Sequence, residues 1–114
     1  MKNYDLEKRT LEFSVKLIKT LKKLPKNLYN YKISAQVIDS GTSIGANYME
    51  ANGAESKKDF IHKVRISLKE SKETRYWLNI LIRINSTMIY ELIALKNESN
   101  EFVLIFGKIT SNNK

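Results

Sequence analysis

The sequence predicts an all-α fold, an up-down four-helix bundle with short connections. Its 114 residues include one proline and four glycines, whereas an all-β fold needs a turn about every 8–12 residues. Apolar residues also recur at helical spacing along the chain. Breaks containing Pro25, Gly53 and Asn85 separate four such segments. The predicted helices span about residues 5–24, 28–52, 56–83 and 87–112.

Local signals support the starts of the two middle helices. Ser56-Lys57-Lys58-Asp59 resembles a capping box, in which the serine oxygen accepts a backbone N–H and an acid lies in the positive first turn. Asn27 can cap the second helix in the same way. The run from Phe102 to Phe106 has the composition of a strand, but it has no second strand to pair with. We therefore expect a helix that is buried on more than one side.

The length of the chain fits a single domain, residues 1–114. With 42% hydrophobic and 28% charged residues, the chain is expected to fold. The absence of cysteine excludes a disulfide scaffold, a thiolate metal site and a cysteine nucleophile. No apolar signal-peptide core follows Met1, and the longest apolar run, 102–106, is far shorter than the roughly 20 residues of a membrane span. These features favour a cytoplasmic protein with no membrane partner.

Positive charge is concentrated at the beginning of the chain, whose formal net charge is +8. Residues 1–32 carry nine Lys or Arg and three acids, hence +6, while residues 33–83 carry +2 and residues 84–114 are neutral. Codons rich in A and T can raise the lysine content, but they do not select a helix face. Seven basic residues of the first segment fall in one arc opposite its apolar face. They are Lys8, Arg9, Lys16, Lys19, Lys22, Lys23 and Lys26.

This basic strip has three interpretations. Cations at successive turns can follow a phosphate backbone and release its counterions, which predicts binding to RNA or DNA. Because aromatic residues are scarce on this face, the contact would be directed at phosphates and carry little sequence information. A solvated helix face produces the same pattern without any partner. A membrane-surface helix is the weakest interpretation, since the apolar face is needed for the core of the bundle.

The second helix carries a polar stripe and two glycines. The stripe consists of Gln36, Ser40, Ser43, Asn47 and Glu50. Gly41 and Gly45 lie on another side of this helix. A glycine in a helix interior costs up to about 1 kcal/mol relative to alanine. The pair therefore predicts that another backbone approaches closely at that side.

In the third helix, Glu70 and Glu73 lie on one stripe between Ile66 and Trp77. Two carboxylates beside an aromatic ring can indicate acid–base catalysis or a carboxylate-bridged metal. The simpler interpretation is ion pairing, either within the bundle, where Lys63 is the best-placed partner, or across a subunit contact. A helix with apolar residues on two faces also favours oligomerisation.

Sequence motifs for catalysis are missing from the chain. It contains no phosphate-binding loop, no dinucleotide-binding fingerprint and no nucleophile elbow. The single histidine, His62, has no Glu three residues before it and lies off the Glu70–Glu73 stripe. We therefore expect no enzymatic activity, no cofactor and no metal.

Three runs occur in order along the middle of the chain: residues 43–51 read SIGANYMEA, residues 58–61 read KDFI and residues 66–78 read ISLKESKETRYWL. Together they resemble the bacterial 23S rRNA intervening-sequence (S23) family. The resemblance covers about residues 8–83. Two departures are Ser67, where the family usually has alanine, and Asn52-Gly53 after the Glu-Ala pair.

The resemblance implies an antiparallel four-helix bundle that assembles as a homopentameric ring. A similar accessory protein of diversity-generating retroelements binds nucleic acid and a reverse transcriptase. The family signature also implies structural or interface roles for six residues. They are Ser43, Asn47, Glu50, Glu70, Glu73 and Trp77.

Taken together, these features predict a non-enzymatic, homo-oligomeric bundle that contacts RNA or DNA through its basic first helix. The alternative is an oligomeric protein–protein adaptor or scaffold, in which the basic face only improves solubility.

Overall fold

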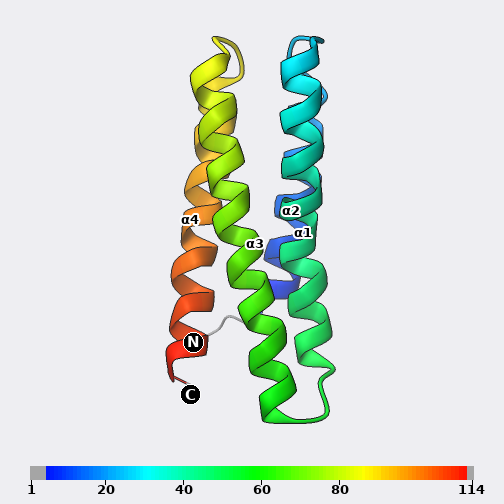
Figure 1. Cartoon of the computed structure of the whole chain (residues 1–114), viewed down its shortest axis with the longest axis vertical. Helices are drawn as coiled ribbons and strands as arrows, with labels where there is room; N and C mark the ends of the chain where they lie inside the picture. Colours follow the sequence, from blue (N-terminus) through cyan, green and yellow to red (C-terminus); the bar gives the residue numbers. More distant parts are fainter. Residues whose placement is uncertain (1–4, 113–114) are drawn as a thin grey trace.

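The computed structural model describes residues 5–112 and forms an antiparallel bundle of four helices (Figure 1). The bundle is elongated, with extents of 45 × 23 × 21 Å. The connections α1–α2 and α3–α4 lie together at one end, which we call the upper end. The predicted all-α, up-down fold is therefore confirmed. The helices are α1 (Leu6–Leu21), α2 (Leu28–Asn52), α3 (Lys57–Ile84) and α4 (Ile89–Asn112).

Helix α1 ends at Leu21, three residues before the predicted end. Pro25 disfavours helical dihedrals at Leu24, so the chain tightens before reaching it. The N–H of Lys23 donates to the carbonyl of Thr20 at 3.0 Å, and that of Leu24 to the carbonyl of Leu21 at 3.2 Å. These i→i+3 bonds are typical of a tightened final turn. The other three helices begin and end within two residues of the predicted positions.

Both predicted caps are present. The Asn27 side chain accepts the N–H of Asn30 at 2.8 Å, and the Ser56 hydroxyl accepts the N–H of Asp59 at 3.0 Å. Each bond satisfies a backbone donor that the first turn of a helix leaves without a partner. The polar residues between the segments therefore define where α2 and α3 begin.

Two amide side chains join the connections at the upper end. Asn30 Nδ2 donates to Asn85 Oδ1 at 2.8 Å, and Asn85 Nδ2 donates to Asn30 Oδ1 at 2.9 Å. Asn30 also donates to the carbonyl of Pro25, and Asn85 to that of Leu81. The start of α2 and the end of α3 are thus held in register by neutral hydrogen bonds.

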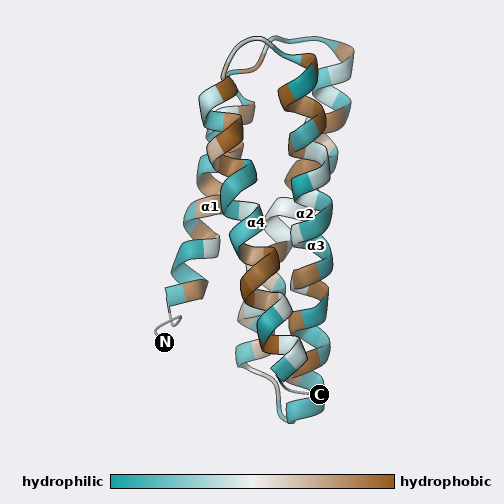
Figure 2. Ribbon diagram, turned by 90° about the vertical axis from the view of Figure 1, so that its left-hand side faces the viewer, coloured by the Kyte–Doolittle hydropathy of each residue, from teal (hydrophilic) through white to brown (hydrophobic). Residues whose placement is uncertain are grey.

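The core is apolar and runs the length of the bundle. Leu17, Ile44, Leu78 and Phe106 are inaccessible to solvent. The stretch that includes Phe102 and Phe106 is helical, as predicted, and appears as a brown band in the lower half of α4 (Figure 2). Along residues 5–112, none of the helices combines the length and apolar character that crossing a membrane requires.

The two glycines of α2 allow α1 to pack closely. A Cβ at Gly45 would lie 2.6 Å from Thr10 Oγ1, 2.9 Å from Thr10 Cβ and 3.5 Å from its carbonyl carbon. A Cβ at Gly41 would overlap a methyl group of Leu17. The predicted close approach of another backbone is therefore found at Gly45, where the approaching element is α1, whereas Gly41 makes room for side chains.

Candidate nucleic-acid interface and signature face

The basic strip lies along α1 and the turn that follows it. Six of its seven members are exposed lysines. Within residues 5–112, no carboxylate comes within 4.0 Å of their ammonium groups. The positions are Lys8, Lys16 and Lys19 on α1, and Lys22, Lys23 and Lys26 beyond its end.

Three of these lysines border a hollow on the side of α1 that faces the start of α4. The hollow has a volume of about 500 Å³. Its charged lining residues are Lys16, Lys19, Lys23, Glu12 and Glu91, and the others are Leu11, Val15, Thr20 and Met88. Three cations against two anions leave this surface positive. The arrangement suits a polyanion whose charges repeat along a line.

Arg9 is the exception among the seven strip residues. Its guanidinium donates to both carboxylate oxygens of Glu98 on α4, at 2.6 and 2.8 Å. It also lies 5.4 Å from the centre of the Phe102 ring. The hydrogen bonds that Arg9 donates to Glu98 raise the pKa of Arg9 further above its ordinary value. Because this charge is neutralised inside the protein, Arg9 joins α1 to α4 and is a poor phosphate ligand.

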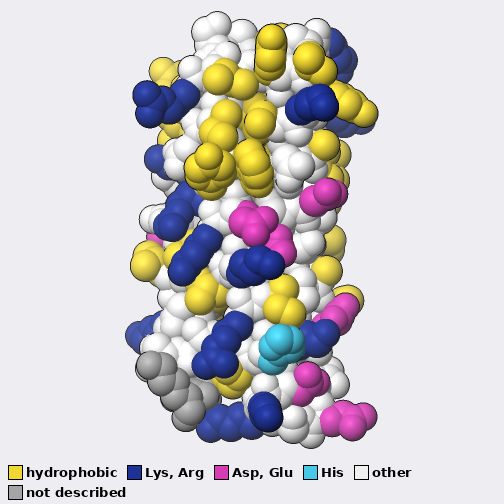
Figure 3. Space-filling model, in the orientation of Figure 1, with side chains coloured by type: hydrophobic (Ala, Val, Ile, Leu, Met, Phe, Trp, Pro, Cys, Tyr) yellow, Lys and Arg dark blue, Asp and Glu magenta, His cyan; other side chains and the backbone are white. Residues whose placement is uncertain are grey.

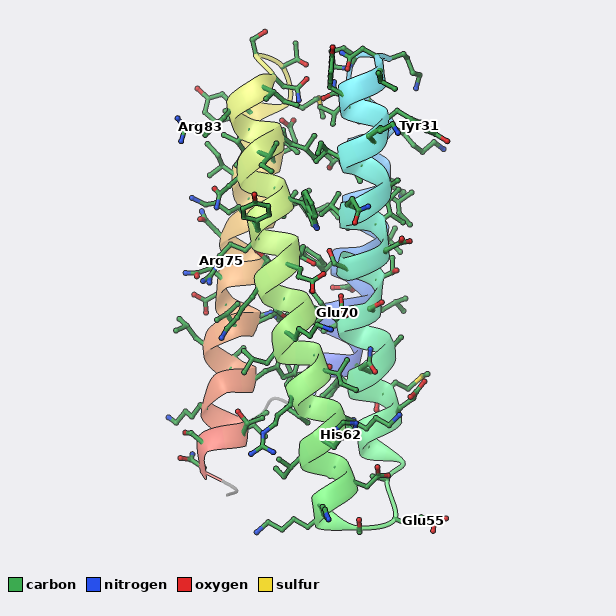
Figure 4. The ribbon with its side chains drawn as sticks, in the orientation of Figure 1. Tyr31, Glu55, His62, Glu70, Arg75 and Arg83 are labelled. Atoms are coloured by element: carbon green, nitrogen blue, oxygen red, sulfur yellow. The ribbon has the colours of Figure 1, made fainter. Side chains whose placement is uncertain are left out.

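All six signature residues lie along the outer side of the α2–α3 seam, which we call the signature face. Ser43, Asn47 and Glu50 come from α2, and Glu70, Glu73 and Trp77 come from α3. Asn47 Nδ2 donates to the carbonyl of Ser43 at 2.9 Å, and the Trp77 ring lies 5.1 Å from that of Tyr76. Figure 4 shows Glu70 extending from α3 toward α2.

Lys63 pairs with Glu50 across the α2–α3 seam, at 2.9 Å, and not with Glu70 as predicted. The seven residues from Lys63 to Glu70 span about 10 Å along a helix, whereas Glu50 lies directly opposite. The hydrogen bond that Lys63 donates to Glu50 raises the pKa of Lys63. Sequence spacing within one helix therefore suggested the wrong acid.

Glu70 is half-buried and, among residues 5–112, forms no ion pair. Its pKa is raised, first by burial, then by the negative charge of Glu73 and, to a smaller extent, by that of Asp39, while Lys69 acts in the opposite direction. Within the same part of the chain, no three His, Asp or Glu side chains come close enough to hold a metal ion. His62 is exposed on α3. Glu70 and Glu73 are therefore acids of the signature face with no ion-pair partner among residues 5–112.

Sequence reasoning missed two buried hydroxyl contacts between α2 and α3. The Ser67 hydroxyl donates to the carbonyl of Ile44 at 2.9 Å, and the Thr74 hydroxyl donates to the hydroxyl oxygen of Ser40 at 2.8 Å. Ser67 is the position where the S23 family usually has alanine. Small side chains at these points let the two helices approach while satisfying the polar groups that they bury.

These features define an all-α, antiparallel four-helix bundle that has a basic first helix and carries Glu70 and Glu73 along its α2–α3 seam. Residues 2–107 match the family described as "23S rRNA-intervening sequence protein", and the chain belongs to that family. No curated protein matches it.

A crystal structure is similar over most of the chain. It is that of a protein of unknown function from the S23 ribosomal protein family of Bacteroides thetaiotaomicron. The two share 36% sequence identity and superpose with a TM-score of 0.79, covering 91% of this chain and 96% of the other. The likeness extends over all four helices and supports the same bundle architecture.

Proposed function

We propose that this protein is a non-enzymatic, self-associating helical bundle that binds RNA or DNA by contacting phosphates through the lysines of α1. One observation carries the proposal: the basic strip contains six exposed lysines that have no acidic partner among residues 5–112. Most charged groups on a small domain are balanced by neighbours of opposite sign. A line of positive charges without acidic neighbours therefore favours a negatively charged partner.

The spacing of the lysines agrees with this role. Lys16 and Lys19 lie on the same side of α1, Lys23 follows in the turn beyond it, and all three line the same hollow. Lys16 and Lys23 are separated by about 10 Å along the axis, which corresponds to about three phosphates of one strand. Such contacts position a backbone without reading bases.

Self-association would strengthen a weak contact. The resemblance to the S23 family implies a ring of five, and five copies of a chain with charge +8 would carry +40. A polymer that spans two or more copies then gains affinity from the high effective concentration of the second site. The description of the family also refers to a sequence that interrupts 23S rRNA, which makes structured RNA the first probe to use.

The test uses two triple variants with the same net charge. Lys16→Glu, Lys19→Glu and Lys23→Glu should abolish binding to an RNA hairpin while leaving the melting temperature nearly unchanged. Lys57→Glu, Lys58→Glu and Lys72→Glu alter exposed lysines of α3 and serve as the control. Binding is measured by fluorescence anisotropy from about 50 to 200 mM salt, and each lost contact should reduce the salt slope by up to about 0.9. Equal loss in both triple variants would show that only net charge matters, and no loss in either would reject the proposal.

The second candidate function is a protein–protein adaptor, favoured by the apolar side chains exposed on α1 and on the signature face. In that case the lysines serve solubility alone. Binding to RNA and DNA would then be undetectable at about 50 mM salt, or it would be insensitive to salt concentration.

A further inference from the structure

Helix α1 exposes an apolar row on the side turned away from the core. Leu11, Val15 and Ile18 are 61%, 45% and 39% exposed. They lie four and three residues apart, which is the spacing of a seam between two helices. Lys8 and Lys22 flank the row, three residues before it and four residues after it. We call these three apolar residues the α1 row.

A hollow extends the α1 row onto α2. Leu11 and Met49 line it, next to Gly45 and Ala46, and its volume is about 640 Å³. Met49 is 58% exposed. Single apolar residues on a surface are ordinary, but a continuous apolar surface with a recess beside it is typical of a contact with another protein.

A second apolar surface lies at the upper end of the signature face. Tyr29 and Ile33 of α2 and Ile80 and Ile84 of α3 line a hollow of about 340 Å³ there. Figure 3 shows the yellow side chains gathered over this end, with acidic side chains directly below them. We call these four residues the α2/α3 patch.

The two surfaces differ in net charge. The α1 row is surrounded by four lysines and two acids, Lys8, Lys16, Lys19, Lys22, Glu7 and Glu12, whereas three acids and one lysine, Asp39, Glu70, Glu73 and Lys69, lie beside the α2/α3 patch. Glu70 has no cation within ion-pair distance among residues 5–112, and burial together with the neighbouring acids disfavours its charged form. Two patches facing each other would bring like charges together, whereas a patch facing a row would bring lysines to these acids.

We infer that the α1 row of one copy packs against the α2/α3 patch of a second copy. This inference rests on the self-association proposed above and identifies its two surfaces. The surfaces lie on different sides of the bundle, so each copy can use both at once. Such a head-to-tail contact repeats from copy to copy and ends only when a ring closes. Leu11 and Val15 of the row also line the hollow with Lys16, Lys19 and Lys23, so this contact borders the lysines that are proposed to bind nucleic acid.

The test removes one surface at a time. The row variant carries Leu11→Gln, Val15→Gln and Ile18→Gln, and the patch variant carries Tyr29→Gln, Ile84→Gln and Glu73→Lys. Leu104→Gln with Tyr90→Gln, both exposed on α4, is the control. Light scattering should give assemblies for the wild type and the control, and 13.3 kDa monomers for each variant alone. An equimolar mixture of the two variants should form a one-to-one complex, because one intact row meets one intact patch.

The outcomes separate this inference from the proposed function. A monomeric wild type would reject self-association itself, while RNA binding by the lysines would be judged independently. A row variant that assembles like the wild type, or a mixture that stays monomeric, would reject the head-to-tail contact alone. If circular dichroism shows the row variant to be unfolded, Lys8→Glu with Lys22→Glu keeps the apolar row. That pair should weaken assembly about tenfold at low salt, and an unchanged assembly would again overturn the inference.

Discussion

Arg9 of α1 and Glu98 of α4 form a two-pronged ion pair across the α1–α4 seam, the least closely packed of the four seams. The side chains are 39% and 30% exposed, so solvent screens the pair only in part. Its geometry, with two parallel N–H···O bonds, is the strongest available to these side chains. Because α1 packs less closely against α4 than against α2, the ion pair supplies part of the interaction that holds α1 and α4 together.

Replacing Arg9 with Ala should lower the free energy of unfolding by about 1 kcal/mol, because both the ion pair and the contact with Phe102 are lost. Urea denaturation of Arg9→Ala, Glu98→Ala and the double variant measures the coupling between the two side chains. A coupling near zero would mean that the pair is only incidental to the fold. RNA affinity should change far less than in the Lys16, Lys19 and Lys23 variant, because the charge of Arg9 is already neutralised.

The close packing at Gly45 predicts an unusual response to alanine. In most helices a glycine-to-alanine change gains up to about 1 kcal/mol, but here the new Cβ would overlap Thr10. We expect Gly45→Ala to destabilise the protein by about 1–3 kcal/mol. Gly107→Ala is the matched control, since nothing lies within 4 Å of its added Cβ, and it should be neutral or stabilising. Equal effects at the two positions, measured by thermal denaturation, would contradict the close approach of α1.

Ser67 offers a test of a departure from the family pattern. Its buried hydroxyl donates to the carbonyl of Ile44, so Ser67→Ala should cost about 1 kcal/mol. Ser43→Ala is the comparison, because the exposed Ser43 hydroxyl bonds only to the carbonyl of Asp39 within its own helix. Chemical denaturation should show a clear shift for the first variant and little for the second. A stabilised Ser67→Ala protein would mean that the buried hydroxyl costs more to desolvate than its hydrogen bond returns.

The raised pKa of Glu70 predicts how its contribution to stability depends on pH. The folded state binds the proton more tightly than the unfolded state, so ionised Glu70 opposes folding. This cost is absent below the unfolded pKa of about 4.5, where both states are protonated. It develops as the pH rises from the unfolded value to the raised folded value, and it persists in full above that.

Glu70→Gln should therefore raise the melting temperature at pH 7 and leave it nearly unchanged at pH 4. Because Glu70 is only partly buried, solvent screening keeps the gain below about 1 kcal/mol. Both proteins should be compared at one low concentration, so that self-association does not contribute. A gain of equal size at the two pH values would point to packing and not to charge as its origin.

The fold could be predicted because its determinants are local. The helical spacing of apolar residues and the caps at Asn27 and Ser56 act within a few positions along the chain. The pairings at the site act between helices and could not be read in the same way. Arg9 pairs with Glu98, which is 89 residues away in the sequence. Lys63 pairs with Glu50 on α2 and not with Glu70 on its own helix. Which basic residues remain without an acidic partner thus depends on how the helices are rotated against one another.

The hydrogen bonds between the side-chain amides of Asn30 and Asn85 have a practical consequence for all of these measurements. The four hydrogen bonds that these two amides donate involve no ionised group, so neither added salt nor a shift in pH weakens them directly. Salt and acid act instead on the lysines of α1, on the Arg9–Glu98 pair and on Glu70. A salt titration that releases a bound nucleic acid should therefore leave the hydrogen bonds between the two connections at the upper end intact. The hydrogen-exchange protection of their amides provides an internal reference against which loosening of α1 can be recognised.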